Sequence, residues 1–325
     1  MVTVVLINPL GAALSHYEQE AVDVLNACGA TTVVRSILEP SASGTGRIRW
    51  LTAYLRELLR TRRGAVSAVV ILWPPIGYLD VIAAMVLGGR RCWIVMHDPV
   101  PLVAAVGFGS AARRCARIIR PNRLVTHSAA ADHAVESALG HRTARLPHPL
   151  LSVCLSNRRH ATRLPVVRVL GQYKNDRDLL LLNNIASALG GETTLEILGR
   201  GWPAVAGWSV HSEFVSEDAF GHAIETADVV VIPYKRFFQS GVAVRCLERG
   251  TPVVGPAGTS LDDLLGANSG LLVHPSASPA AWAAAIEYAI EQGRPEMHRA
   301  ALAARAAAVD EWGKWLRIVL PAGTS

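Results

Sequence analysis

Residues 228–255 read DVVVIPYKRFFQSGVAVRCLERGTPVVG. The run VVVIPY predicts a buried strand, the pattern from about Gly241 to Arg249 predicts a helix, and TPVVG begins a second buried strand. Two buried strands joined by a helix are typical of a parallel sheet covered by helices on both faces. Ser240 is a suitable N-cap, so the unpaired first-turn amides and the helix dipole favour a bound phosphate. An ordinary serine-capped turn explains these residues equally well.

The alternation of short β-branched runs with helical patterns extends over the whole chain. Strands are expected at 3–8, 68–73, 92–97 and 123–127, and then at 166–171, 194–199, 228–234, 251–255 and 270–274. This order predicts an α/β protein with two Rossmann-like, doubly wound domains that face a cleft.

The domain boundaries follow from a break in this alternation. We expect an N-terminal domain at 1–150, a linker at 151–165 and a C-terminal domain at 166–305. Alanine-rich helices are expected at 278–292 and 295–309, and the last segment, 306–325, is expected to pack back on the N-terminal domain.

Composition agrees with two folded cores. The chain has 325 residues, 50% of them hydrophobic, and a single core rarely grows beyond about 250 to 300 residues. Five scattered cysteines without a CxxC pair predict neither a disulfide framework nor a zinc site. Residues 64–89 contain one charged side chain and are long enough to span a bilayer, but a strand, a PPIG loop and a buried helix explain them better. The expected location is therefore cytoplasmic.

Polar residues and glycines follow several of the predicted strands, where ligands of such sheets bind. Lys174 follows the strand at 166–171, and Arg200 lies between two glycines after the strand at 194–199. Gly11 lies in an NPLG loop after the first strand, although the pattern is too incomplete for a dinucleotide site. His97 ends the strand at 92–97 and is followed by Asp98. Each of these residues, taken alone, is more often solvated or structural.

Together these motifs resemble the GT-B glycosyltransferases. GQYKN, LEILGRG, the stretch from PYKRF to TPVV, and GLLVHP are similar to the donor-binding domain of the retaining, nucleotide-sugar-dependent group, which includes glycogen synthase and bacterial mannosyltransferases (family 4-like enzymes). NPLG, HDP and VTHS extend the resemblance to the first half of the chain. The resemblance implies a nucleotide-diphosphate sugar as co-substrate, no cofactor, and an acceptor site in the N-terminal domain.

The resemblance also implies roles for individual residues. Lys174 would bind the donor diphosphate, with Arg177 or Arg200 as the second cation. The turn at Ser240 and Gly241 would bind the sugar or the same diphosphate. His97 would lie beside the transferred sugar, and Asp98 would orient it or lie in the acceptor pocket. The residues implied near the donor sugar or nucleotide are Gly11, Tyr234, Gln239, Arg245 and Glu248.

The chain departs from the family pattern at two positions. The family commonly has two glutamates eight positions apart around this helix, and the second binds the ribose; this chain has Phe237 and Arg245 there. Glu248 shares a helical face with Arg245, so it either replaces the missing carboxylate in a shifted geometry or pairs with Arg245.

The expected activity is a metal-independent glycosyl transfer. Positioned cations and helix amides can stabilise a leaving diphosphate, and no carboxylate pair stands at a predicted strand end. Family analogy adds retention of the anomeric configuration and a glycan, lipid-linked or small-molecule acceptor. The alternatives are a nucleotide-sugar 2-epimerase and a catalytically degenerate homologue that serves as a binding or scaffold subunit.

The formal net charge of +6 raises the question of an anionic partner. Residues 47–63 combine six arginines with an apolar stripe. The pattern indicates either peripheral contact with an anionic membrane, at the inner face of the cell membrane, or a surface helix with solvated arginines. No nucleic acid partner is expected, because the arginines come without a recognisable RNA or DNA module.

Overall fold

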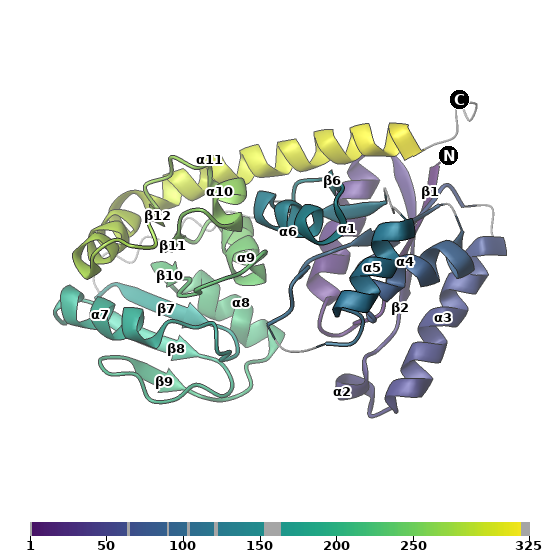
Figure 1. Ribbon diagram of the computed structural model, residues 1–325. Coiled ribbons are helices and arrows are strands. Elements are labelled where there is room, and N and C mark those ends of the chain that lie inside the picture. The colour runs from purple at the N-terminus through teal and green to yellow at the C-terminus, as the bar shows by residue number, and fades with distance from the viewer. Residues whose placement is uncertain are drawn as a thin grey trace. The chain divides into compact units, whose positions relative to one another are not determined.

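The computed structural model describes residues 2–63, 66–89, 91–102, 105–119, 123–152 and 164–319. The chain divides into two compact units, which we call unit 1 (Met1–Leu151 with Arg305–Ser325) and unit 2 (Ser152–Ala304). Each unit has one six-stranded parallel sheet interleaved with helices, which confirms the predicted α/β class with two Rossmann-like domains (Figure 1). The expected linker at 151–165 lies mostly outside the described residues.

The sheet of unit 1 has the strand order β2-β1-β3-β4-β5-β6. The chain direction across the sheet reverses between β1 and β3, and such a switch point is where ligands of open parallel sheets bind. The elements of unit 1 before its C-terminal helix are β1 (Val2–Asn8), α1 (Ser15–Ala27), β2 (Ala30–Ser36), α2 (Pro40–Ser43), α3 (Arg47–Arg63), β3 (Ala68–Ile71), α4 (Leu79–Ala83), the π-helical turn η1 (Ala84–Gly88), β4 (Cys92–Val95), α5 (Ser110–Ile119), β5 (Leu124–Thr126), α6 (Ala129–Leu139) and β6 (Ala144–Arg145).

The two faces of this sheet are buried by different helices, because side chains alternate between the faces along each strand. Val4 and Leu6 point to the face covered by α1 and by the last turns of the C-terminal helix. Val5 and Ile7 point to the other face, which α3, α4, α5 and α6 cover. The strands are therefore apolar on both sides, as the continuous hydrophobic runs of the sequence predict.

The sheet of unit 2 has the order β12-β11-β10-β7-β8-β9, so its switch point lies between β7 and β10. The elements of unit 2 are β7 (Val166–Leu170), α7 (Leu179–Leu189), β8 (Thr194–Leu198), β9 (Ser209–His211), α8 (Glu217–Glu225), β10 (Val229–Val231), α9 (Gly241–Arg249), β11 (Val253–Pro256), α10 (Ser260–Leu265), β12 (Leu272–Val273) and the first part of α11 (Pro279–Val319).

The C-terminal part of the chain forms one long helix, α11. The prediction of two separate helices at 278–292 and 295–309 is therefore wrong. Pro295 lies inside α11, where a proline removes one backbone hydrogen bond and costs about 3 kcal/mol. The alanine-rich sequence favours the helix on both sides of Pro295. Burial anchors both ends of α11, with Trp282 and Ile286 buried in unit 2, and Trp312 and Trp315 buried in unit 1.

The segment at 64–89, which was long enough to span a bilayer, is described from residue 66 onwards. The described part of this segment folds as β3, a loop, α4 and η1, in agreement with the preferred prediction. Throughout the described residues, no helix has both the length and the apolar character required to cross a bilayer.

Replacing Trp312 by alanine should destabilise unit 1 strongly. The Trp312 side chain is 1% exposed, and its Nε1 donates a hydrogen bond to the carbonyl of Pro147 at 3.0 Å. Truncating a buried tryptophan leaves a cavity and an unpaired acceptor, so we expect the free energy of unfolding to fall by about 3 to 5 kcal/mol in urea denaturation. Leu302→Ala is the matched control, because Leu302 is 54% exposed on the same helix; equal losses in the two variants would contradict the assignment.

Candidate functional site

In unit 2, two loops present cations at the carboxyl edge of the sheet. Lys174 follows β7, Arg200 follows β8, and both side chains are exposed. The loops are joined by hydrogen bonds from the Tyr173 N–H to the Arg200 carbonyl at 3.0 Å and from Trp202 Nε1 to the Gly171 carbonyl at 2.7 Å. The rings of Tyr173 and Trp202 also meet edge to face at 5.3 Å. Lys174 and Arg200 are therefore attached to a braced pair of loops.

Gly199 is required by this contact between the loops. Its φ is +150°, and a Cβ atom there would lie 2.1 Å from the Gly171 carbonyl oxygen. No other residue fits so close to a neighbouring backbone. The sequence showed only that Arg200 lies between two glycines, and the structure shows why the first of them must be glycine.

The serine cap predicted at the start of α9 is confirmed. Ser240 has extended backbone angles, and its Oγ accepts a hydrogen bond from the Ala243 N–H at 3.3 Å. Gly241 is exposed, and a Cβ atom there would meet nothing within 4 Å. The first N–H groups of α9 lie outside the hydrogen-bond pattern of the helix, so they and the helix dipole favour an anion at this end.

Arg177, in contrast, is buried beneath the same loops. Its guanidinium lies 3.5 Å from the ring centroid of Tyr234, and Nη1 is 3.0 Å from Asp176 Oδ2. Backbone hydrogen bonds from the Lys235 N–H to the Asp176 carbonyl and from the Asp178 N–H to the Pro233 carbonyl join the same two segments. Arg177 therefore fastens the loop after β7 to the loop after β10, across the switch point of the sheet.

The Arg177 and Asp176 pair is not fully satisfied by its surroundings. Within the described residues, Arg177 Nε and Asp176 Oδ1 are buried without a hydrogen-bond partner. Burial also raises the pKa of Tyr234, while the adjacent Arg177 acts in the opposite direction. The stacked aromatic ring and the carboxylate both offset part of the desolvation of the guanidinium.

Helix α9 is joined to α8 through Arg245. Its Nη1 lies 2.7 Å from Glu217 Oε2, and its guanidinium lies 5.2 Å from the ring centroid of Phe220. The position at which the family pattern has a ribose-binding glutamate thus holds an arginine engaged in an ion pair. Glu248, one turn later on the same helix, is buried, with 5% of its surface exposed. The Gln239 side chain, just before the cap, is half-buried.

In unit 1, the NPLG loop is closed by a carboxylate from elsewhere in the chain. The Gly11 N–H donates to the Ile37 carbonyl at 2.9 Å, and the N–H groups of Ala12 and Ala13 donate to the two Glu39 oxygens at 3.1 and 3.0 Å. Glu39 is 8% exposed. Sequence reasoning missed Glu39, because nothing in the pattern around it differs from that of a surface loop.

Three buried histidines follow three neighbouring strands of unit 1. His97, His127 and His148 come after β4, β5 and β6, and each is at most 7% exposed. Ring centroids are 5.6 Å apart for His97 and His127 and 5.1 Å apart for His127 and His148. The Tyr17 ring of α1 lies within 5.7 Å of all three. From the sequence only His97 is a candidate, and the order of the strands brings His127 and His148 beside it.

Hydrogen bonds fix the protons of this cluster. His127 Nδ1 lies 3.0 Å from the Leu146 carbonyl, so Nδ1 bears the proton and Nε2 accepts from the Tyr17 hydroxyl at 2.7 Å. His97 Nε2 donates to the Leu72 carbonyl at 3.0 Å, and its ring stacks on Trp73 with centroids 5.4 Å apart. The ring of His97 is therefore held in one orientation. Asp98, next in sequence, is half-buried.

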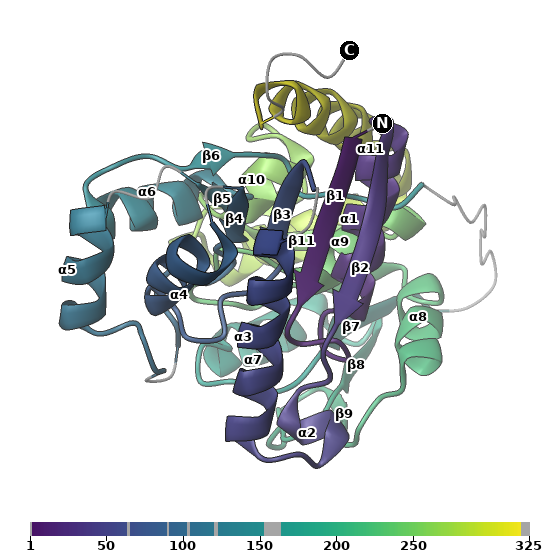
Figure 2. The ribbon, with the colours of Figure 1, turned by 90° about the vertical axis from the view of Figure 1, so that its right-hand side faces the viewer.

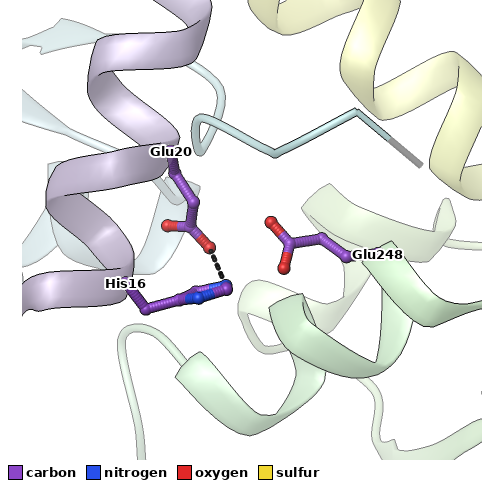
Figure 3. Close-up of side chains that lie close together, drawn as sticks. All are labelled: His16, Glu20 and Glu248. Carbon is purple, nitrogen blue, oxygen red and sulfur yellow. Dashed lines mark ion pairs between the residues drawn. The ribbon is translucent and has the colours of Figure 1, made fainter. Parts of the chain in front are cut away.

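Burial keeps two members of the cluster, His127 and His148, uncharged. It lowers the pKa of His127 to about 3, and the neighbouring His97 acts in the same direction. The pKa of His148 is also lowered well below 6.5 by burial and by the other histidines. Negative charge comes from Glu20 of α1, which is 2% exposed and lies 3.2 Å from His16 Nε2 (Figure 3) and 3.7 Å from His148 Nδ1.

Comparison with known proteins identifies the fold. No family model and no curated protein sequence matches the chain. Among solved structures, it is similar to sucrose-phosphate synthase from Thermosynechococcus elongatus, with a TM-score of 0.66 and 14% identity over 98% of this chain and 99% of that one. Anabaena Alr3699/HepE in complex with UDP-glucose gives a TM-score of 0.65 and 12% identity over the same shares.

A third similar structure is an α,α-trehalose-phosphate synthase from Burkholderia xenovorans in complex with glucose-6-phosphate. Its TM-score is 0.60 and its identity 10%, again over 98% of this chain and 99% of that one. These are GT-B glycosyltransferases, so the chain has the GT-B fold, and the resemblance inferred from the sequence motifs is confirmed at the level of the fold.

The buried histidines should make the protein lose stability in acid. The pKa of His127 is depressed from 6.5 to about 3, so its contribution is complete above pH 6.5 and is lost as the pH falls towards 3. In this window the unfolded chain takes up a proton that folded His127 does not, and each such proton contributes a slope of up to about 1.4 kcal/mol per pH unit.

His127→Gln tests this assignment by urea denaturation at a series of pH values. The glutamine amide can donate to Leu146 and accept from Tyr17 but does not titrate, so the variant should show a shallower slope. His148 acts in the same direction, so some slope will remain. His298→Gln, at an exposed position of α11, is the control. An unchanged slope in His127→Gln would show that His127 is not the depressed group.

Proposed function

We propose that the chain transfers a sugar from a nucleotide-diphosphate donor to a glycan, lipid-linked or small-molecule acceptor, without a metal ion. One observation supports this proposal above the others. In a unit of the GT-B fold, two exposed cations on braced loops, Lys174 and Arg200, accompany a serine-capped helix that begins at Gly241 with open space beside its backbone. All three features follow strands of one parallel sheet and so belong to its carboxyl edge.

The chemistry of a leaving diphosphate suits these groups. Negative charge grows on the diphosphate as the glycosidic bond breaks, and fixed donors stabilise that charge more in the transition state than in the ground state. Lys174 acts as a point charge, Arg200 offers a planar fork of donors, and the first amides of α9 add the helix dipole. Arg177 holds the loops in place through Tyr234.

The sugar end of the reaction is assigned to His97. The ring of His97 is fixed by Leu72 and Trp73, so the imidazole is presented in one orientation. The ligands of the similar HepE structures, UDP and UDP-glucose, favour a UDP-sugar as the first donor to test. Retention of the anomeric configuration is proposed from the resemblance of the sequence motifs to the retaining group.

A second candidate is a GT-B homologue that binds a donor or a partner without catalysis. Arg177 is occupied by Tyr234 and Asp176, and Arg245 is occupied by Glu217 at the position where the family pattern places the ribose-binding carboxylate. Both arginines are thus engaged within the protein, which favours a donor recognition different from that of the family pattern and so supports this second candidate.

Lys174→Ala should weaken donor binding by about tenfold to a hundredfold, the usual loss of one charge-assisted hydrogen bond. Calorimetric titration with UDP, GDP, ADP and TDP and their sugars measures this and identifies the base. Arg299→Ala, at an exposed position of α11 in unit 2, should leave the affinity unchanged.

The outcomes separate the two candidates. Donor binding that depends on Lys174, together with sugar transfer that persists in a chelator, supports the transferase. The same binding without turnover of any donor and acceptor supports the non-catalytic homologue. A folded protein that binds none of these nucleotides contradicts both.

A further inference from the structure

The positive charge of the chain is concentrated in one segment. Residues 40–131 contain thirteen arginines and three acidic residues, an excess larger than the net charge of +6 of the whole chain, so the remainder is net negative. Two of the three carboxylates are compensated or hidden. Glu57 pairs with Arg35 and Arg60, and Asp80 is fully buried.

Most of this segment covers one face of the unit 1 sheet. Tyr54 and Leu58 of α3, Ala84 of η1, and Ala112 and Ala116 of α5 all pack into the same core, so the outer sides of these elements face away from it. Figure 2 shows α3, α4 and α5 together on this side of the sheet. Helix α4 packs against both η1 and α5, and η1 packs against α3.

Topology brings the final turns of these elements to one edge. Each lies between two parallel strands and runs back from the carboxyl edge of the sheet, so each ends near its amino edge. There exposed cationic and exposed aliphatic side chains occur together. The surface, which we call the arginine face, consists of Leu59 and Arg62 of α3, Met85 and Val86 of η1, and Arg114 and Ile118 of α5.

The apolar members of the arginine face are strongly exposed. Met85 is 49%, Val86 is 53% and Ile118 is 76% exposed, and Arg62 Nη1 donates to the Val86 carbonyl at 2.9 Å. Arginines near helix C-termini are partly explained by the helix dipole. The dipole gives no reason for aliphatic side chains in water beside them. A surface that offers both guanidinium groups and aliphatic side chains fits the headgroup and acyl boundary of an anionic bilayer.

We propose that the arginine face is a docking surface for an anionic lipid bilayer, with Met85, Val86 and Ile118 inserting between the headgroups and Arg62 and Arg114 binding lipid phosphates. A nucleic acid would satisfy the charge but would leave the aliphatic side chains in water, and stacking on bases needs aromatic ones. The proposal does not depend on the glycosyl transfer proposed above, because vesicle binding is measured without any donor.

Sedimentation with vesicles tests the docking surface. The full chain should bind vesicles of phosphatidylcholine containing about one part in three phosphatidylglycerol, and not phosphatidylcholine alone, with binding weakened by salt. Met85→Ser/Val86→Ser keeps every charge and should reduce binding about tenfold through lost insertion. Arg62→Gln/Arg114→Gln should reduce it at low salt.

Matched controls lie on unit 2. Phe214→Ser removes an 80% exposed apolar side chain, and Arg299→Gln removes an exposed arginine, and neither should change binding. The proposal is overturned if the wild-type chain does not bind the anionic vesicles at low salt. It is equally overturned if Met85→Ser/Val86→Ser binds as the wild type does, or if duplex DNA is bound more tightly than the vesicles and independently of Met85 and Val86.

Discussion

The parallel direction of the strands is the constraint on which the other features depend. Parallel pairing sends every strand end to one edge of a sheet and every returning helix end to the other. In unit 2 the carboxyl edge gathers Lys174, Arg200 and the start of α9, and in unit 1 it gathers the three histidines. The opposite edge of unit 1 gathers the ends of α3, η1 and α5. The parallel pairing of the strands thus places the candidate site residues at one edge of a sheet and the arginine face at the opposite edge.

Buried polar groups then determine the shape of each edge. Arg177 lies between Asp176 and the Tyr234 ring, and it ties two loops that flank the switch point of the unit 2 sheet. Glu39 does the same for the NPLG loop of unit 1 by accepting from two consecutive amides. Removing one member of such a buried pair leaves an uncompensated charge, so these residues matter for position even where they touch no ligand.

The position of the expected ribose carboxylate shows how a fold can be kept while a contact changes. Arg245 lies on the same helix as the Ser240 cap, which retains its hydrogen bond to Ala243. Arg245 is paired with Glu217 of the neighbouring helix. The serine cap that suits a diphosphate can therefore be kept while the side chain expected to bind the ribose differs. The base and the sugar of the donor have to be measured.

The sequence by itself determined the alternation of strands and helices, the two-domain α/β class, and the Ser240 cap with α9 from Gly241 to Arg249. Those features depend on hydrophobic periodicity and on residues within a few positions of one another. Only the tertiary structure decided that Arg177 is buried, that Glu39 closes the NPLG loop, and that the three histidines form one cluster. Each depends on segments far apart in the chain that sheet order places side by side. The continuity of α11 through Pro295 was decided in the same way, because burial at both ends outweighs a local signal to stop.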